Sequence, residues 1–288
     1  MKRFGICTLL LLLLACSAFA QPDFRNADSL FNKACDYNAA LAELKSMEPV
    51  TDGKAKAELL WRMARVQLVI GQQETGKEGK RSVFGQGIRY AEQGIALDSR
   101  NVGCYFWHCA NVGRECQTRG KMQQASKVSV MMKDLEMILN TLNRTDCSEA
   151  WQALAEIYYH HPFKSTDAAI NFARKAIDEI PSGESRLSSY IFLAQMLRDR
   201  NWSASRRREE INDNVKELAR LKSGKSSNID KFALYSAIKD TGVNACKLAE
   251  LSDAQEVQAI VKYALEKYRR LSFKSKVDEA DYKQLLKF

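Results

Sequence analysis

The sequence predicts an all-α protein, an α-solenoid of antiparallel helix pairs with a helical cap at its C-terminal end. Two observations support this prediction. Only 4 of the 288 residues are Pro and 14 are Gly, and this scarcity of helix breakers favours helix throughout. In addition, an aromatic residue recurs at spacings of 46, 44 and 39 residues, namely Trp61, Trp107, Trp151 and Tyr190. A period in this range is typical of stacked helical repeats.

Each recurring aromatic is followed three or four residues later by an alanine, as in "WRMARV" from Trp61 and "WQALAE" from Trp151. This pattern places a large and a small side chain on one face, about one helical turn apart. It predicts four equivalent first helices, one in each repeat.

A second amphipathic segment follows each of the first three of these helices, over residues 87–101, 133–146 and 167–181. Two of the three carry small residues at steps of three or four, such as Gly87, Ala91 and Gly94, which allow two helices to approach closely. Pro181 ends the last of them. Residues 24–222 are therefore predicted to form the repeat domain.

The remaining segment, residues 226–288, is also predicted to be helical. Ser252 and Gln255 have the spacing of a capping box at the start of one long helix. A solenoid needs a terminal element to cover its last apolar face, and we interpret this segment as that C-terminal cap.

The first residues have the character of an export signal. Lys2 and Arg3 precede a short apolar run that is too short to span a bilayer. Cleavage after "AFA" would leave residues 1–20 as a signal peptide. Alternatively, "LLAC" resembles a lipobox, so that residues 1–15 would be removed and Cys16 acylated. Either route predicts an exported protein in the periplasm or associated with the outer membrane.

The chain is mildly basic, with a formal net charge of +9 that falls to about +7 when Lys2 and Arg3 are removed. In an exported protein such a surface favours anionic lipid, glycan or an acidic partner over nucleic acid. Arg198, Arg200 and the run "SRRREE" at 205–210 concentrate part of this charge. Because two glutamates end the run, we interpret it as a solvated helix face.

The repeated pattern resembles the tetratricopeptide repeat over about residues 27–221. Within that superfamily, "GRECQTRGK", "IYYHHP" and the alanine-rich second helices resemble two groups. One group is the regulator-of-microtubule-dynamics-like proteins, and the other is the T-component lipoproteins associated with bacterial TRAP transporters. The resemblance implies a helical solenoid that binds a partner. The second group further implies a periplasmic solute-binding protein as that partner.

The segment "NVGCYFWHCANVGRECQTRG" at 101–120 carries three cysteines and a histidine. On a helix, Cys109 and Cys116 fall within the apolar arc, where they pack as small hydrophobic residues. Cys104, His108 and Glu115 fall on the opposite, polar side. Cys104 and His108 lie one turn apart, a spacing that can chelate a metal. Two or three ligands from one helix form only an open site, however, so we expect neither a metal nor a cofactor.

The same polar stripe is predicted to face a concave groove that binds a ligand; the alternative is a merely solvated helix face. The equivalent positions of the other first helices are polar as well, and together they suit a peptide or another polar ligand. The predicted groove residues are Arg62, His108, Glu115, Gln152, Glu156, Tyr159, Gln195 and Arg198.

These observations lead to one function and one alternative. We expect a non-catalytic scaffold that binds a protein or peptide of the cell envelope in its groove. The alternative is a ligand-handling accessory of a TRAP-type solute transport system. Cys104, His108 and Glu115 are the only candidates for a catalytic cluster, and no nucleophile with a family-like context accompanies them.

Overall fold

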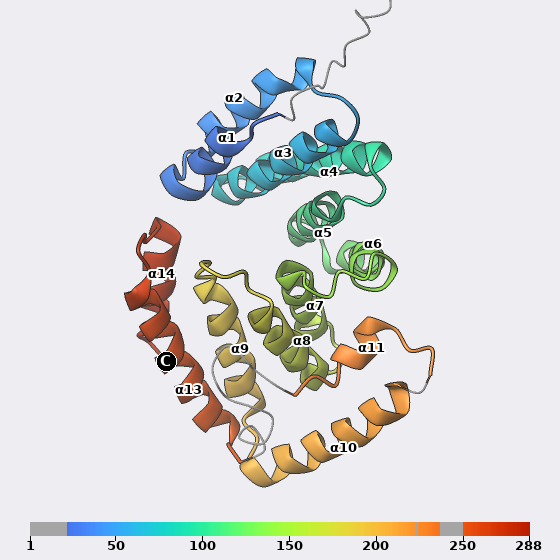
Figure 1. Ribbon diagram of the computed structural model, residues 1–288, viewed down its shortest axis with the longest axis vertical. Coiled ribbons are helices and arrows are strands. Elements are labelled where there is room, and N and C mark those ends of the chain that lie inside the picture. The colour runs from blue at the N-terminus through green and yellow to red at the C-terminus, as the bar shows by residue number, and fades with distance from the viewer. Residues whose placement is uncertain (1–21, 223, 237–249) are drawn as a thin grey trace, which may run out of the picture.

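The computed structural model describes residues 22–222, 224–236 and 250–288, and these segments fold into helices joined by short connections, without a strand (Figure 1). The all-α, solenoid-like prediction is therefore confirmed. In the same segments no helix is both long and apolar enough to cross a bilayer. The predicted leader, including Cys16, lies outside the described residues.

The four repeated aromatics lie on four separate helices, as predicted. They occupy α3 (Gly53–Gln73), α5 (Val102–Gln117), α7 (Ser148–His160) and α9 (Leu187–Arg200). The second helices are α4 (Lys77–Leu97), α6 (Lys121–Glu136) and α8 (Thr166–Asp178), with the short π-helix η3 (Met137–Thr141) continuing α6. Trp151 is fully buried and stacks on Phe172 of α8, which ties the two helices of that pair together.

Two apolar clusters support this array. The smaller one forms at the N-terminal end, where α3 meets α1 (Arg25–Ser29), η1 (Leu30–Ala34) and α2 (Tyr37–Met47), which a short 3-10 turn, η2 (Glu48–Val50), follows. The larger cluster extends from α5 through α9 into the C-terminal helices. Cys109 and Cys116 are buried, as the helical arc predicts, and Cys109 belongs to the larger cluster.

Small residues allow close helix packing between the α3–α4 pair and the α5–α6 pair. A Cβ atom on Gly94 of α4 would overlap the Cys104 sulfur of α5, and one on Gly87 would overlap the Asn111 amide. Glycine at these positions lets the axes of α4 and α5 approach more closely than any side chain would permit. The structure thus gives the physical reason for the small residues in the second helices.

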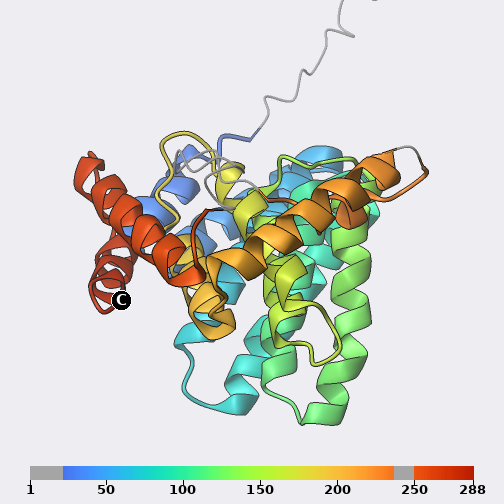
Figure 2. The same ribbon diagram turned by 90° about the horizontal axis from the view of Figure 1, so that it is seen from below.

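The C-terminal segment contains α10 (Ala204–Lys222), α11 (Asn228–Phe232), α13 (Asp253–Arg270) and α14 (Lys276–Leu285). The main contact of α13 is with α9, the last of the four equivalent helices, and α14 packs on α9 and α13. Figure 1 shows α13 and α14 along one side of the molecule and α10 across its lower end, and Figure 2 shows the same helices from below. The predicted capping box of Ser252 and Gln255 is present. The boundary predicted between repeat and cap at residues 222–226 stays a prediction.

Candidate functional site

The structure brings five of the eight predicted groove residues together on two helices. Tyr159 of α7 donates a hydrogen bond to Asp199 of α9. Gln195 donates to the same carboxylate at 2.8 Å, and Arg198 donates to Gln195 at 2.6 Å. We call this surface the α7–α9 face; its residues are Gln152, Glu156, Tyr159, Gln195, Arg198 and Asp199, all of them exposed or half-buried.

A shallow recess of about 440 Å³ adjoins the α7–α9 face. Tyr159 and Asp199 form one side of it. The other lining residues come from the start of α8 and the end of α9 and are Ser165, Thr166, Asp167, Arg200 and Trp202. Most of these side chains are polar, and Trp202 supplies the one large apolar surface. The recess has room for a side chain of a bound segment.

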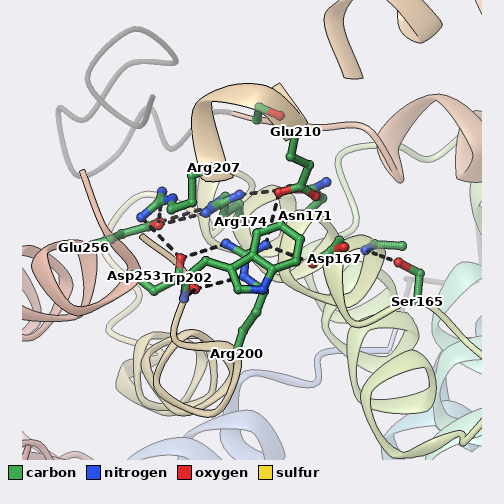
Figure 3. Close-up of polar contacts among 12 residues, drawn as sticks. Ser165, Asp167, Asn171, Arg174, Arg200, Trp202, Arg207, Glu210, Asp253 and Glu256 are labelled. Atoms are coloured by element: carbon green, nitrogen blue, oxygen red, sulfur yellow. Dashed lines mark hydrogen bonds and ion pairs between the residues drawn. The ribbon is translucent and has the colours of Figure 1, made fainter. Parts of the chain in front are cut away.

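A network of buried ion pairs lies beside the recess, where α8, α9, α10 and α13 meet (Figure 3). Arg200 makes two hydrogen bonds to the fully buried Asp253, at 2.9 and 2.7 Å. Its third nitrogen donates to Asp167, a recess residue, at 3.0 Å. The backbone amide of Trp202 also donates to Asp253, at 2.8 Å. The network thus fixes three residues that line the recess.

The second half of the network centres on Glu256 of α13, which is fully buried. It accepts two hydrogen bonds from Arg174 of α8, at 3.1 and 2.8 Å, and another from Arg207 of α10. The solvated face expected for the basic run at 205–210 is therefore wrong for Arg207, which is only 1% exposed. Its neighbours Arg206 and Arg208 are exposed.

Charges in and around the network shift several pKa values. Burial lowers the pKa of Arg200, but the hydrogen bonds and charge of Asp253, with Glu210 and Asp167, raise it by more. Burial raises the pKa of Glu210, and the charge of Asp167 adds to the effect. On the α7–α9 face, burial and the bond to Asp199 raise the pKa of Tyr159 to about 12. Tyr159 therefore carries its proton at neutral pH and acts as a donor.

His108 and Glu115 do not line an open surface, and this part of the prediction is wrong. His108 is 9% exposed and Glu115 is 3% exposed. His108 Nδ1 lies 2.7 Å from Asp134 of α6, while Glu115 pairs with Arg119 one turn later. The polar stripe of α5 is covered because α4 and α6 pack over it. Asp134 of α6 supplies the polar partner of the buried His108, whereas the partner of Glu115 comes from the turn that follows α5.

The pair of His108 and Asp134 predicts a pH-dependent stability. Burial lowers the pKa of His108, but Asp134 and the charge of Glu92 raise it above the usual 6.5. Burial also raises the pKa of Asp134, despite its bond to His108. The folded chain therefore binds these protons more tightly than the unfolded chain does. The contribution of His108 is complete below pH 6.5 and is lost as the pH rises through the folded value.

We expect the free energy of unfolding of the wild type to decrease above pH 6.5 more steeply than that of His108→Gln. Urea denaturation at several pH values measures both slopes. The difference between the two proteins reports the titration of the coupled His108–Asp134 pair, because the other titrating groups are shared. Parallel slopes, or a steeper slope for the variant, would contradict this account.

Arg62 lies apart from the α7–α9 face. Its guanidinium contacts Asp28 of α1 and Glu58 of α3 and lies 4.2 Å from the ring centroids of both Phe24 and Trp61. The segment around α1 covers it, so only 14% of its side chain is exposed. The structure therefore assigns Arg62 a role in holding this N-terminal segment on α3.

Cys104, like the rest of the α5 stripe, is fully buried, and its sulfur lies 3.5 Å from the Ala57 carbonyl oxygen. Burial raises the pKa of its thiol to about 12, which keeps it protonated at neutral pH. The thiols of Cys35, Cys104, Cys109 and Cys147 are free. Across the described segments, no group of three or more His, Cys, Asp or Glu side chains is arranged to hold a metal ion.

Sequence reasoning missed the members of the site that depend on distant partners. Asp199 follows a predicted groove residue directly, and its position one turn after Gln195 was a usable signal. For Asp167, Trp202, Asp253 and Glu256 the chain offers no such signal. Their partners come from other helices, up to 82 residues away along the sequence.

Part of this chain matches a known protein family, although no individual curated protein is significantly similar to it. Residues 23–146, less than half of the chain, match the family described as regulator of microtubule dynamics protein 1-3. The match spans α1 to α6 and ends before α7, so it includes Arg62, His108 and Glu115 but not the α7–α9 face. Over its N-terminal part the chain is thus a helical protein similar to the regulators of microtubule dynamics.

Proposed function

We propose that this protein is a non-catalytic scaffold that binds a segment of a partner protein across the α7–α9 face. One observation carries the proposal. Side chains predicted to bind a partner gather on two neighbouring helices, remain accessible to solvent, and adjoin a recess lined by Tyr159, Asp199 and Trp202. Mixed charged and amide groups on a helical-repeat surface suit a polar peptide.

The chemistry of the face favours a partner segment over a small apolar solute. Tyr159 and Gln195 already hold Asp199 in place through hydrogen bonds, so little side-chain freedom is lost on binding. Five of the seven residues that line the recess are polar or charged, whereas sites for apolar ligands are lined mainly by hydrophobic and aromatic side chains. Trp202 gives a bound side chain one apolar surface to pack against.

The proposal includes export of the chain. It rests on the basic start, the apolar run and the two processing sites of the leader, which predict either Gln21 or an acylated Cys16 as the first residue. Export places the partner in the cell envelope. Fractionation of the native organism tests this part, and recovery of the endogenous protein in the cytosol would contradict it.

Affinity capture from the envelope fraction tests partner binding. The bait is the mature chain, and the test variant is Gln195→Ala/Arg198→Ala on the α7–α9 face. The matched control is Lys216→Ala/Arg220→Ala on α10, where both side chains are more than 70% exposed. We expect the test variant to bind at least about tenfold more weakly, because central interface residues dominate binding energy.

The results of the affinity capture distinguish the proposed scaffold from the transport accessory. A partner retained by wild type and control but lost by the test variant supports the α7–α9 face as the site. If that partner is a solute-binding protein, the chain is an accessory of a solute transport system. Equal capture by all three baits would overturn the proposed site.

A further inference from the structure

The turn between α13 and α14 carries a dense positive charge that the proposed partner site does not use. Residues 267–277, "KYRRLSFKSKV", contain five basic residues and no acidic residue. Arg269, Arg270, Lys274 and Lys276 are exposed. Figures 1 and 2 show α13 and α14 along one side of the molecule.

Two apolar side chains project from the same turn. Phe273 and Val277 are each 54% exposed. Tyr268 of α13 stacks on Tyr282 of α14 with ring centroids 4.2 Å apart, and this contact joins the two helices without Phe273. Phe273 thus lies exposed between Arg270 and Lys274. Arg270 is 3.6 Å from Glu266 in a solvent-exposed ion pair, and Lys274 donates to a backbone carbonyl oxygen.

The turn is held in a fixed shape. Ser275 forms a capping box with Asp278 at the start of α14, and Lys274 donates to the Leu271 carbonyl oxygen at 2.9 Å. Asp278 also accepts a hydrogen bond from Ser185, which anchors the turn to the segment before α9. Phe273 is therefore presented on an ordered turn, and little conformational entropy opposes its insertion into another phase.

We propose that the α13–α14 turn docks on an anionic phospholipid surface, with Phe273 and Val277 entering the interface and the flanking Arg and Lys contacting the head groups. Charge complementarity identifies the occupant. Basic residues are attracted to anionic lipid, and an aromatic side chain is stable at the boundary between head groups and acyl chains. A soluble acidic partner would satisfy the charges but would not require two unshielded apolar side chains among them.

Sedimentation with vesicles tests the proposal on the full mature chain. One set of vesicles contains phosphatidylcholine with phosphatidylserine, and the other contains phosphatidylcholine alone. The charge variant is Arg269→Glu/Lys276→Glu, and its control with the same change in net charge is Lys216→Glu/Arg220→Glu on α10. The apolar variant is Phe273→Ser, and its control is Phe163→Ser, which alters a side chain that is 90% exposed in the loop before α8.

We expect wild-type binding only to vesicles that contain phosphatidylserine, with affinity falling as salt screens the charges. Each basic residue near an anionic surface contributes about fivefold, so the charge variant should bind more than about 20-fold more weakly. Phe273→Ser should bind about tenfold more weakly, because it removes an apolar side chain from the interface. Both controls should bind as the wild type does, and all five proteins should have the same circular dichroism.

Three results would overturn the proposal. They are equal binding to both kinds of vesicle, equal losses in test and control variants, and binding of soluble polyglutamate through Arg269 and Lys276 without any binding to vesicles. The last result would identify an acidic protein as the occupant instead. None of these measurements involves the α7–α9 face, so failure here and failure of the proposed partner site are distinguishable.

Discussion

Glu256→Ala is expected to lower the free energy of unfolding by about 3–5 kcal/mol, because it leaves buried positive charges without their partner. Arg174 is 3% exposed and Arg207 is 1% exposed, and both donate hydrogen bonds to the Glu256 carboxylate. Asp253 lies 3.4 Å from Arg207, but its two oxygens already accept bonds from Arg200 and cannot replace the Glu256 carboxylate. Chemical denaturation at neutral pH measures the loss.

The control for this prediction is Arg208→Ala on α10, beside Arg207 in sequence but exposed. Surface substitutions of this kind change stability by less than about 0.5 kcal/mol. A second comparison uses Arg207→Ala/Glu256→Ala. The double variant should lose less free energy of unfolding than the two single variants lose in sum, because Arg207 and Glu256 share one interaction. Additive losses, or a loss at Glu256 as small as that at Arg208, would show that the network contributes little.

The network also links stability to the candidate site. Arg200 lines the recess and depends on Asp253 for its position, and Asp253 lies at the start of the same helix as Glu256. A variant that loosens α13 should therefore weaken partner binding on the α7–α9 face as well. Gln195→Ala/Arg198→Ala should weaken binding without lowering stability, because it removes solvent-accessible side chains that contact the partner. A substitution in the α13 network should weaken binding and lower stability together, because it leaves a buried charge without its partner.

The repeat architecture was predictable because its signal is local and periodic. The aromatic and alanine spacing from Trp61 to Tyr190 can be found in the sequence whatever the exact packing. Ala64, Ala155 and Ala194 are fully buried, as that pattern requires, but Ala110 of α5 is only half-buried because the polar stripe of that helix faces inward. Gln152, Glu156 and Tyr159 were equally accessible to sequence reasoning, because they lie opposite the buried side of α7.

The buried polar groups were not predictable by the same reasoning. Periodicity assigns polar residues to the solvent side, and this rule fails when another helix supplies a partner. His108 meets Asp134, which lies 26 residues later, and Arg207 meets Glu256, which lies 49 residues later. No spacing rule connects such pairs. For this reason the sequence misplaced the stripe on α5 and missed the network beside the recess.

Replacing either of two glycines of α4 by alanine should change the free energy of unfolding, but in opposite directions. The two glycines, Gly85 and Gly87, lie only two residues apart. A Cβ atom on Gly85 would meet only the end of the Arg89 side chain, at 3.7 Å. Gly85→Ala should therefore raise the free energy of unfolding by about 0.5–1 kcal/mol, because alanine loses less backbone entropy in a helix. Gly87→Ala should lower it by about 1–3 kcal/mol through overpacking.

The cost at Gly87 comes from a neighbour that cannot move freely. Its Cβ atom would overlap the Asn111 amide, which is fully buried and donates to the Ala64 carbonyl at 3.0 Å and the Trp107 carbonyl at 2.8 Å. Thermal denaturation of both variants, and of Gly87→Ala in an Asn111→Ala background, tests this account. Removing the amide should abolish the penalty and leave only the helix-propensity gain. If the penalty persists in that background, the close approach of α4 and α5 is not limited by Asn111, and the glycine is required for another reason.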